Sequence, residues 1–472
     1  MEGFLTKNQI RYVLLHLDLC FELSEELISC MRFLRTPTEQ ADNPTIDFML
    51  SVKGFRDDQL LFIDGLPVLF PFGKHEKFYS IKENGIVFHH DLLKSAFYLL
   101  SGYQEQEPEY LDTLGRYPYE LSVQAKLGII DKPIVNYYFQ VISDGIKQFC
   151  ELNHLPWKER SPTGMTLFLS HDVDQVDTYS LNETLYYLKK CFTGGQKGVQ
   201  DNRDYKKYAR IYTKNYFRPG PKKNPAWSFP YLLEKEKSRQ IISSYFFLPR
   251  GQKHQDAYYR FTEKRIQRLF SLLIEEGCEI GLHGTVQSAI SGRTLISNLN
   301  ELNEASPSSV KGIRQHRLMY QQGITSRLHE AAGVRYDTTL GFAAHEGFRN
   351  SFCLPFRLFD HQNDKMLDVW EIPLMVMDVT LFHYRKYDFA EAMDAVNRLI
   401  TEVRKFEGVF SLLWHNSFLN EETYPGIRSF YEELLDRLSS AMHQCETGER
   451  IIDRMDPVSQ KFLDRNDPLN IS

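Results

Sequence analysis

The stretch TLFLSHDVD, residues Thr166–Asp174, decides the fold of this chain. An apolar run leads into a polar tip, a pattern typical of a buried strand in a parallel sheet. If extended geometry persists through the tip, Asp172 and Asp174 point to the same side of the strand. Two carboxylates at the end of a strand suit a metal site in which one binds the ion and the other acts as a base. In the alternative interpretation, they cap the next turn or helix.

Segments with strand and helix patterns alternate after this stretch, and the alternation indicates βαβ units and a parallel sheet. We expect strands at residues 165–170, 241–248, 278–282, 310–313, 334–339, 367–373 and 409–414. We expect helices at residues 228–239, 262–276, 293–304, 321–332, 389–406 and 424–442. Seven strands of this kind form either an open doubly wound sheet or an incomplete barrel.

The segments before and after this alternating region are expected to form separate parts of the chain. Residues 1–155 are expected to form a smaller N-terminal α/β domain of unknown role, with a hairpin turn at Asp64-Gly65. A linker with two prolines and a glycine follows, so the second domain is expected at residues 163–442. The tail, residues 443–472, is polar and is expected to be irregular.

One insertion, residues 193–226, interrupts the alternation and is strongly basic. Its basic residues are Lys197, Arg203, Lys206, Lys207, Arg210, Lys214, Arg218, Lys222 and Lys223. The insertion fits a solvated surface segment. It also fits a lid or a site for an anionic part of a substrate, because it directly follows the strand that carries Asp172.

Composition narrows the classes of function. A formal net charge of −6 implies no general affinity for nucleic acid. Seven scattered cysteines without CxxC spacing indicate reduced thiols rather than a disulfide framework. The N-terminal residues lack the pattern of a secretion signal, and no run of about 18 uncharged apolar residues occurs. We therefore expect a cytoplasmic protein without a membrane span.

Polar side chains capable of chemistry follow four of the predicted strands. These residues are Asp172, Asp174, His283, Arg314, His316 and His415. Parallel α/β sheets and barrels place their active sites at the carboxyl ends of the strands. We therefore expect these six side chains to meet in one active site.

Five motifs carry a resemblance to a known family. SHDVD, GLHGTVQS, GIRQHRLMY, RYDTTLGFA and LLWHNS resemble, in this order, the successive motifs of the polysaccharide deacetylases, carbohydrate esterase family 4. The resemblance covers residues 165–425 and is closest to a bacterial subgroup with an HDVD motif and an N-terminal α/β domain. It implies a distorted, incomplete (β/α) barrel of about seven parallel strands. It also implies hydrolysis of acetyl groups on sugars with one divalent metal ion.

The resemblance gives a role to each residue of the first two motifs. Asp172 matches the catalytic base, and Asp174 takes the place of the metal carboxylate, because Val173 stands between them. His283 matches the first histidine ligand of the second motif. The second histidine of that motif is replaced by Gln287, whose neutral amide is a poorer ligand for a borderline metal than imidazole.

The later motifs complete the expected site. His316, at a neighbouring strand end, is the expected third metal ligand, with Gln287 or a water molecule as the alternative and a degraded site as a further one. Arg314 matches the arginine that orients the catalytic carboxylate, and His415 matches the general acid. The expected metal is zinc, with cobalt or nickel as alternatives.

The expected function is that of a metal-dependent deacetylase. Its expected substrate is the N-acetyl group of an amino sugar or a polysaccharide precursor, nucleotide-linked or lipid-linked. One alternative is an amidohydrolase that acts on a small non-sugar amide, because fold alone does not fix the substrate. The other is a non-catalytic carbohydrate-binding protein with a decayed metal site, which the glutamine at position 287 favours.

Overall fold

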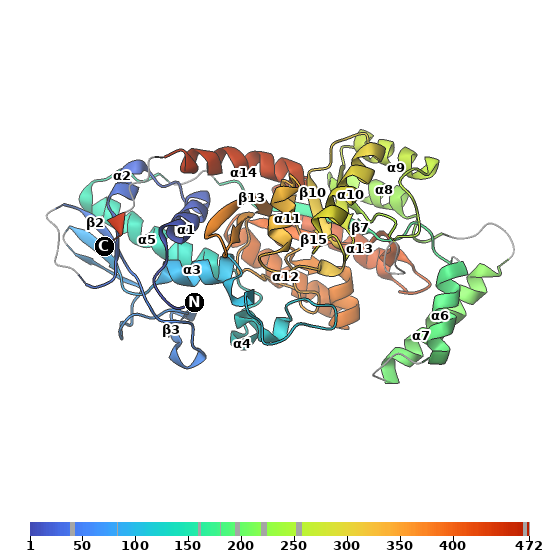
Figure 1. Ribbon diagram of the computed structural model, residues 1–472, viewed down its shortest axis with the longest axis horizontal. Helices are drawn as coiled ribbons and strands as arrows, with labels where there is room; N and C mark the ends of the chain where they lie inside the picture. Colours follow the sequence, from blue (N-terminus) through green and yellow to red (C-terminus); the bar gives the residue numbers. More distant parts are fainter. Residues whose placement is uncertain are drawn as a thin grey trace.

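The protein contains two main β-sheets that lie side by side and are both covered by helices (Figure 1). The structure is a computed structural model. It describes residues 1–37, 43–82, 84–158, 162–179, 181–193, 199–218, 224–251, 257–465 and 470–471. The mixed α/β class predicted from the sequence is confirmed.

The larger sheet has ten strands, in the order β12-β13-β11-β10-β9-β8-β7-β15-β14, with β16 beside β7. Its strands are β7 (Thr166–Val173), β8 (Ser243–Phe247), β9 (Glu279–Gly284), β10 (Gly312–Gln315), β11 (Tyr336–Asp337), β12 (Phe356–Asp360), β13 (Lys365–Glu371), β14 (Val376–Met377), β15 (Val409–Leu413) and β16 (Gln444–Cys445). Among the described residues β12 and β14 do not pair with each other, so the sheet forms an open, incomplete barrel.

All seven predicted strands are present as immediate neighbours, and every pair between them is parallel. The expected count of about seven strands is nevertheless too low. The two-residue strands β14 and β16 are too short to show a period, and β12 pairs antiparallel with β13. Strands β14 and β16 arise from pairing with strands far away in the sequence, whereas β12 forms an antiparallel hairpin with β13.

The six predicted helices of this region are also present and cover the sheet. They are α8 (Phe229–Lys237), α9 (Lys264–Glu275), α10 (Gly292–Ala305), α11 (Thr325–Ala331), α12 (Phe389–Lys405) and α13 (Ile427–Ala441). In α9, for example, Ile266, Leu269, Phe270 and Leu273 are buried at the spacing of one helical face.

Strand β7 shows how the alternation of side chains positions the site. Leu167 and Leu169 join the apolar cluster beneath the outer helices, whereas Phe168 joins a separate cluster that contains side chains from β8, β11, β13 and β15. Asp172 has the same parity as Phe168 and therefore points to the inner side of the sheet. His171 has the opposite parity, and it hydrogen-bonds Glu236 of α8.

The smaller sheet has five strands, in the order β17-β1-β2-β6-β5. Its strands are β1 (Met31–Leu34), β2 (Thr45–Met49), β5 (Tyr79–Lys82), β6 (Gly85–Phe88) and β17 (Asn470–Ile471). The accompanying helices are α1 (Lys7–Cys20), α2 (Glu25–Ser29), α3 (Leu92–Leu100), α4 (Val123–Leu127) and α5 (Ile134–Asn153). The predicted hairpin is confirmed as β3 (Leu61–Ile63) and β4 (Leu66–Val68), whose turn residues Asp64 and Gly65 both have positive φ.

The C-terminal segment is not irregular, so that expectation is wrong. It forms helix α14 (Gly448–Leu463), followed by β17 on the N-terminal sheet. Ile451 and Ile452 pack into the inner cluster of the barrel, and Met455 and Val458 pack against the same cluster one and two turns later. This helical spacing was present in the sequence, but the many charged residues between these positions obscured it.

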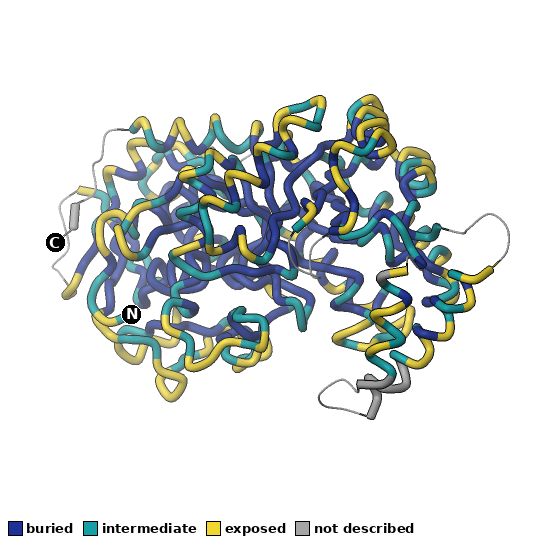
Figure 2. The backbone as a smooth tube through the Cα atoms, turned by 45° about the vertical axis from the view of Figure 1, so that its right-hand side comes forward, coloured by how far each residue is buried: buried dark blue, intermediate teal, exposed yellow. Residues whose placement is uncertain are grey.

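The basic insertion, residues 193–226, contains helix α7 (Val199–Tyr216), which projects from the barrel together with the preceding helix α6 (Leu181–Thr193) (Figures 1 and 2). Lys197, Lys222 and Lys223 lie outside the described residues, as does the side chain of Arg203.

Among the helices of the described part of the chain, none is long and apolar enough to span a bilayer.

Candidate metal centre

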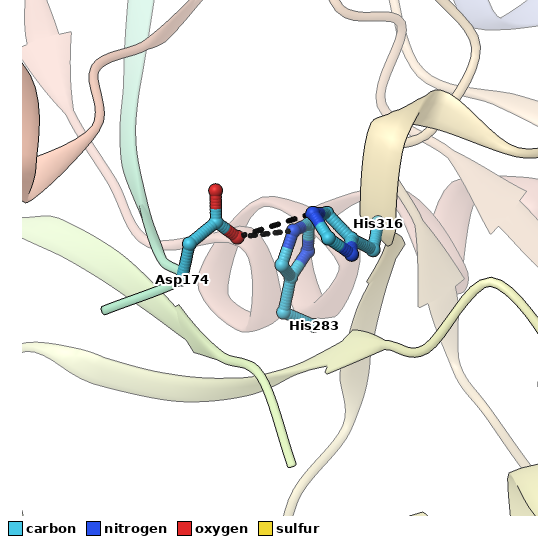
Figure 3. Close-up of side chains that lie close together, drawn as sticks. All are labelled: Asp174, His283 and His316. Atoms are coloured by element: carbon cyan, nitrogen blue, oxygen red, sulfur yellow. Dashed lines mark ion pairs between the residues drawn. The ribbon is translucent and has the colours of Figure 1, made fainter. Parts of the chain in front are cut away.

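Three of the predicted side chains converge at the carboxyl edge of the large sheet (Figure 3). Asp174 follows β7, His283 lies on β9, and His316 follows β10. The Oδ1 atom of Asp174 lies 3.2 Å from Nε2 of His283 and 3.6 Å from Nε2 of His316. One ligand atom from each of the three residues lies within 4.8 Å of the other two, a spacing that can hold a metal ion.

Hydrogen bonding fixes the proton of His283 on the nitrogen remote from this centre. Its Nδ1 lies 2.9 Å from the backbone oxygen of Arg314, which can only accept, so Nδ1 carries the proton. In the neutral ring, Nε2 then presents a lone pair to Asp174 and, at 3.6 Å, to Asp172. Lone pairs that face one another in a buried place need a cation between them, either a proton or a metal ion.

The remaining polar atoms of the centre also fit a metal ion. Burial lowers the pKa of His316 to about 4, so its ring is neutral at neutral pH, the form that binds metals. Among the described residues, Oδ1 of Asp174 and Nδ1 of His316 are buried and have no hydrogen-bond partner. The Asp174 side chain is still 31% exposed, which leaves the centre open to solvent on that side.

Gln287, the alternative third ligand, is exposed in the turn that follows β9. Its neighbour Ser288 is buried and donates a hydrogen bond to Gln315 at 2.8 Å. His316 lies beside Asp174, with Nε2 at 3.6 Å from Oδ1, whereas the Gln287 side chain is exposed. The roles of these side chains in binding remain a prediction.

Asp172 is held by Arg314 next to the three-residue centre. The NH1 group of Arg314 donates to Oδ1 of Asp172 at 2.9 Å and to the hydroxyl of Ser170 at 3.0 Å. Its other nitrogens donate to the backbone oxygen and the hydroxyl of Thr338, and the guanidinium lies 4.8 Å from the ring centre of Phe246. Because Arg314 is fully buried and each of its three guanidinium nitrogens donates a hydrogen bond, it fixes the orientation of the Asp172 carboxylate.

His415 is held in the same way by a residue that sequence reasoning missed, Asp378. Nδ1 of His415 lies 2.7 Å from Oδ1 of Asp378, and the His415 backbone N–H donates to Oδ2 at 2.6 Å. Burial alone would lower the pKa of His415, but Asp378, followed by Asp174 and Asp172, raises it to about 10. The free nitrogen, Nε2, lies 3.8 Å from Oδ2 of Asp174 and so faces the metal centre.

The structure thus brings all six predicted residues together and adds Asp378. A signal for Asp378 was present, because the apolar run PLMVM ends in this aspartate just as the run before Asp172 ends in a carboxylate. The strand before it, β14, has two residues and gave no recognisable period. The fold and site together define a mixed α/β protein with an open barrel and a candidate Asp-His-His metal centre.

Comparisons with known proteins give the following matches. Residues 31–151 match a family model described as a family of unknown function, DUF7033. No curated protein matches the chain. The family match includes strands β1, β2, β5 and β6 of the smaller sheet but none of the residues of the candidate metal centre.

Several solved structures are similar to the larger part of the chain. A Mycobacterium smegmatis protein described as a polysaccharide deacetylase is 16% identical, with 65% of this chain and 94% of that chain covered and a TM-score of 0.42. The PuuE allantoinase is 12% identical, with 62% and 90% covered and a TM-score of 0.40. A Bacillus anthracis pseudoenzyme of carbohydrate esterase family 4 is 10% identical, with 64% and 71% covered and a TM-score of 0.29. All three scores are below 0.5, so the site is interpreted from its own geometry.

Proposed function

We propose that this chain is a metal-dependent hydrolase of amide bonds that removes the N-acetyl group from an amino sugar or a polysaccharide precursor. One observation carries the proposal. A carboxylate and a histidine, Asp172 and His415, face the same Asp-His-His centre, and each is held by a buried partner of opposite charge. A hydrolase of this kind needs a base and an acid at one reacting centre.

Asp174, His283 and His316 would hold the metal ion. When bound, a divalent cation supplies Lewis-acid chemistry, because it polarises a carbonyl oxygen and acidifies water. Asp172 would take the proton from the attacking water, and Arg314 keeps its carboxylate aligned for that transfer. His415, whose pKa is raised to about 10, carries a proton at neutral pH and would donate it from Nε2 to the leaving amine.

The proposal also specifies the metal and the substrate. Zinc suits two imidazoles and a carboxylate, and cobalt or nickel suit the same set. The proposed substrate is an acetylated amino sugar that carries a nucleotide or lipid group. A cytoplasmic location is proposed because none of the seven cysteines forms a disulfide.

The test is metal content and acetate release, measured on the same preparations. We expect about one zinc-like ion per chain and acetate release from at least one member of a panel of acetylated amino sugars and nucleotide sugars. Replacing the base, Asp172→Asn, should reduce turnover by about a thousandfold or more and leave metal content unchanged. Loss of metal and turnover together would instead assign Asp172 to metal binding.

Two other outcomes would redirect the proposal. Release of ammonia or a carboxylic acid only from small non-sugar amides would make the chain an amidohydrolase of a different substrate class. A metal-loaded protein that hydrolyses no member of either panel, but binds acetylated sugars, would make it a carbohydrate-binding protein. The exposed Gln287 does not by itself favour a carbohydrate-binding protein, because His316 lies beside Asp174 as a candidate third ligand.

A further inference from the structure

Helices α6 and α7 form a projecting arm, defined here as residues 181–193 and 199–218 (Figures 1 and 2). Its root is tied to the loop that follows β15. The hydroxyl of Tyr179 donates to Glu422 at 3.0 Å, and Lys207 donates to the backbone oxygen of Thr423 at 3.3 Å. Because α6 follows the carboxyl end of β7 and this loop follows the carboxyl end of β15, the arm is rooted at the same edge of the sheet as the metal centre.

In the part of α7 whose side chains are described, the exposed face is cationic. Every residue of α7 whose side chain is described and exposed is a lysine or an arginine: Lys206, Lys207, Arg210 and Lys214. Positions 206, 210 and 214 are four residues apart, so these side chains line up along one face of the helix. Among the described residues, Lys206, Arg210 and Lys214 have no carboxylate partner within 4.0 Å. The stretch from 181 to 218 contains nine Lys or Arg and three Asp or Glu, although the whole chain is acidic.

The arm also exposes large apolar side chains. Leu181, Leu185 and Tyr186 of α6 are exposed, and Phe217, directly after α7, is 73% exposed. No other large apolar side chain among the described residues is as exposed as Phe217. Isolated exposed apolar residues need no explanation, but four on one cationic arm indicate a surface that contacts an amphipathic partner.

We propose that the arm docks the protein onto an anionic lipid membrane surface. The lysines and arginines would pair with headgroup phosphates, and Phe217 and the leucines would enter the boundary between headgroups and acyl chains. A free nucleotide would pair with the cations but leave the apolar side chains exposed. A second copy of the arm would repel the first, because both carry the same cationic face.

The proposal extends beyond the proposed hydrolysis and does not depend on it. If both hold, the arm brings the metal centre to lipid-linked sugars at the membrane. A chain that binds membranes but hydrolyses nothing would support the docking proposal and contradict the proposed hydrolysis. A chain that hydrolyses its substrate but does not bind membranes would support the hydrolysis and contradict the docking proposal.

The test is co-sedimentation of the full chain with vesicles of phosphatidylcholine, with and without phosphatidylglycerol. We expect binding that requires phosphatidylglycerol and weakens as salt increases. The triple variant Lys206→Gln, Arg210→Gln, Lys214→Gln should bind at least tenfold more weakly. The matched control Lys74→Gln, Lys77→Gln, Lys264→Gln removes the same charge from exposed positions elsewhere and should bind like the wild type.

Further variants test whether the apolar side chain of the arm and the metal centre contribute to membrane binding. Phe217→Ser should weaken binding about threefold and leave its salt dependence unchanged. His283→Ala should bind vesicles like the wild type, because the metal centre takes no part in docking. Circular dichroism of the triple variant checks that the arm stays helical.

Several results would overturn the proposal. Equal weakening in the arm and control triples would show a general charge effect. Pyrophosphate binding that the arm triple abolishes, without any vesicle binding, would make the arm a site for a soluble phosphate. A dimer seen by light scattering that the arm triple dissociates, again without vesicle binding, would make the partner a second copy.

Discussion

His283 and His316 face the same carboxylate, but the fold holds them in different ways. His283 lies within β9, between two parallel neighbours, and its ring is anchored on the backbone oxygen of Arg314. His316 begins a tight turn, η4 (His316–Leu318), and its Nδ1 has no hydrogen-bond partner among the described residues. The sheet therefore orients one histidine, whereas the other depends on a turn.

That turn has an unfavourable backbone conformation. Arg317 and Leu318, the two residues after His316, have φ angles of 61° and 54°, in the left-handed region. Each such residue other than glycine costs on the order of 1 kcal/mol. The compensating contact comes from the N-terminal part of the chain, where Arg116 donates to the backbone oxygen of Arg317 at 2.7 Å and pairs with Asp112.

The metal centre is therefore not a property of the barrel alone. The sheet fixes His283, and Asp174 comes directly after β7, but the position of His316 depends on a contact across about 200 residues of sequence. The N-terminal part, whose role the sequence did not reveal, would then support the third metal ligand.

Removal of the histidine on the sheet should have the largest effect. His283→Ala deletes a ligand whose position the surrounding strands fix, so no neighbour can replace it. We expect loss of bound metal and a decrease in turnover of about a thousandfold or more. Elemental analysis and acetate release measure both. The matched control is His75→Ala, at an exposed histidine of the N-terminal part, which should retain both metal and activity.

Acidification should lower the stability of the folded protein through protonation of His16 of α1. Its Nε2 accepts the backbone N–H of Arg357 at 3.0 Å, and burial lowers the pKa of His16 from 6.5 to about 3. Between these two pH values the unfolded chain binds more protons than the folded chain. Stability is therefore complete above pH 6.5 and falls as the pH decreases toward 3, with a slope of at most about 1.4 kcal/mol per pH unit from this residue.

Urea unfolding at several pH values measures this slope. In His16→Gln the amide oxygen can still accept the Arg357 N–H, but it does not titrate. The variant should lose less stability than the wild type between pH 6 and pH 4. An identical pH dependence in both proteins would exclude His16 as the titrating group.

Removal of the contact to the turn should have an intermediate effect. Arg116→Ala frees the backbone oxygen of Arg317, so we expect about a tenfold loss of metal affinity, the size typical of a residue that orients a ligand. A chelator competition measures the affinity. The exposed Arg56→Ala is the matched control and should leave it unchanged.

A double-mutant cycle shows whether Arg116 acts through the turn. In a His316→Ala background, Arg116→Ala should cause no further loss of metal affinity, because the ligand that the turn positions is already absent. An additional tenfold loss in that background would contradict the comparison, since Arg116 would then act on His283 or Asp174 instead.

The smallest expected effect concerns the backbone of the turn itself. Arg317→Gly removes the steric cost of positive φ but increases the entropy of the unfolded chain, so stability should change by less than about 0.5 kcal/mol. Arg317→Val should lower stability by about 1–2 kcal/mol, because a β-branched side chain tolerates this region poorly. Urea unfolding measures both. Equal stability of the two variants would mean that the turn is unstrained.

Seven of the ten barrel strands, and the side chains at their ends, could be predicted from the sequence alone. The run before Asp172 is apolar and Asp172 has the parity of Phe168, so local alternation was enough to place its carboxylate on the inner side of the sheet. Because parallel strands share one carboxyl edge, the residues at the carboxyl ends of β7, β9, β10 and β15 were expected to lie near one another. The resemblance to the deacetylase motifs added roles that these positions alone do not give.

Only the tertiary structure decided which of the remaining polar residues complete the site. It placed His316 rather than Gln287 beside Asp174, added Asp378 behind His415, and brought Arg116 to the strained turn. It also placed Ile451 and Ile452 of the C-terminal helix inside the barrel. The physical reason is the same in each case. Local patterns report the period of one element, whereas these contacts join elements far apart in sequence, and no local period records such a pairing.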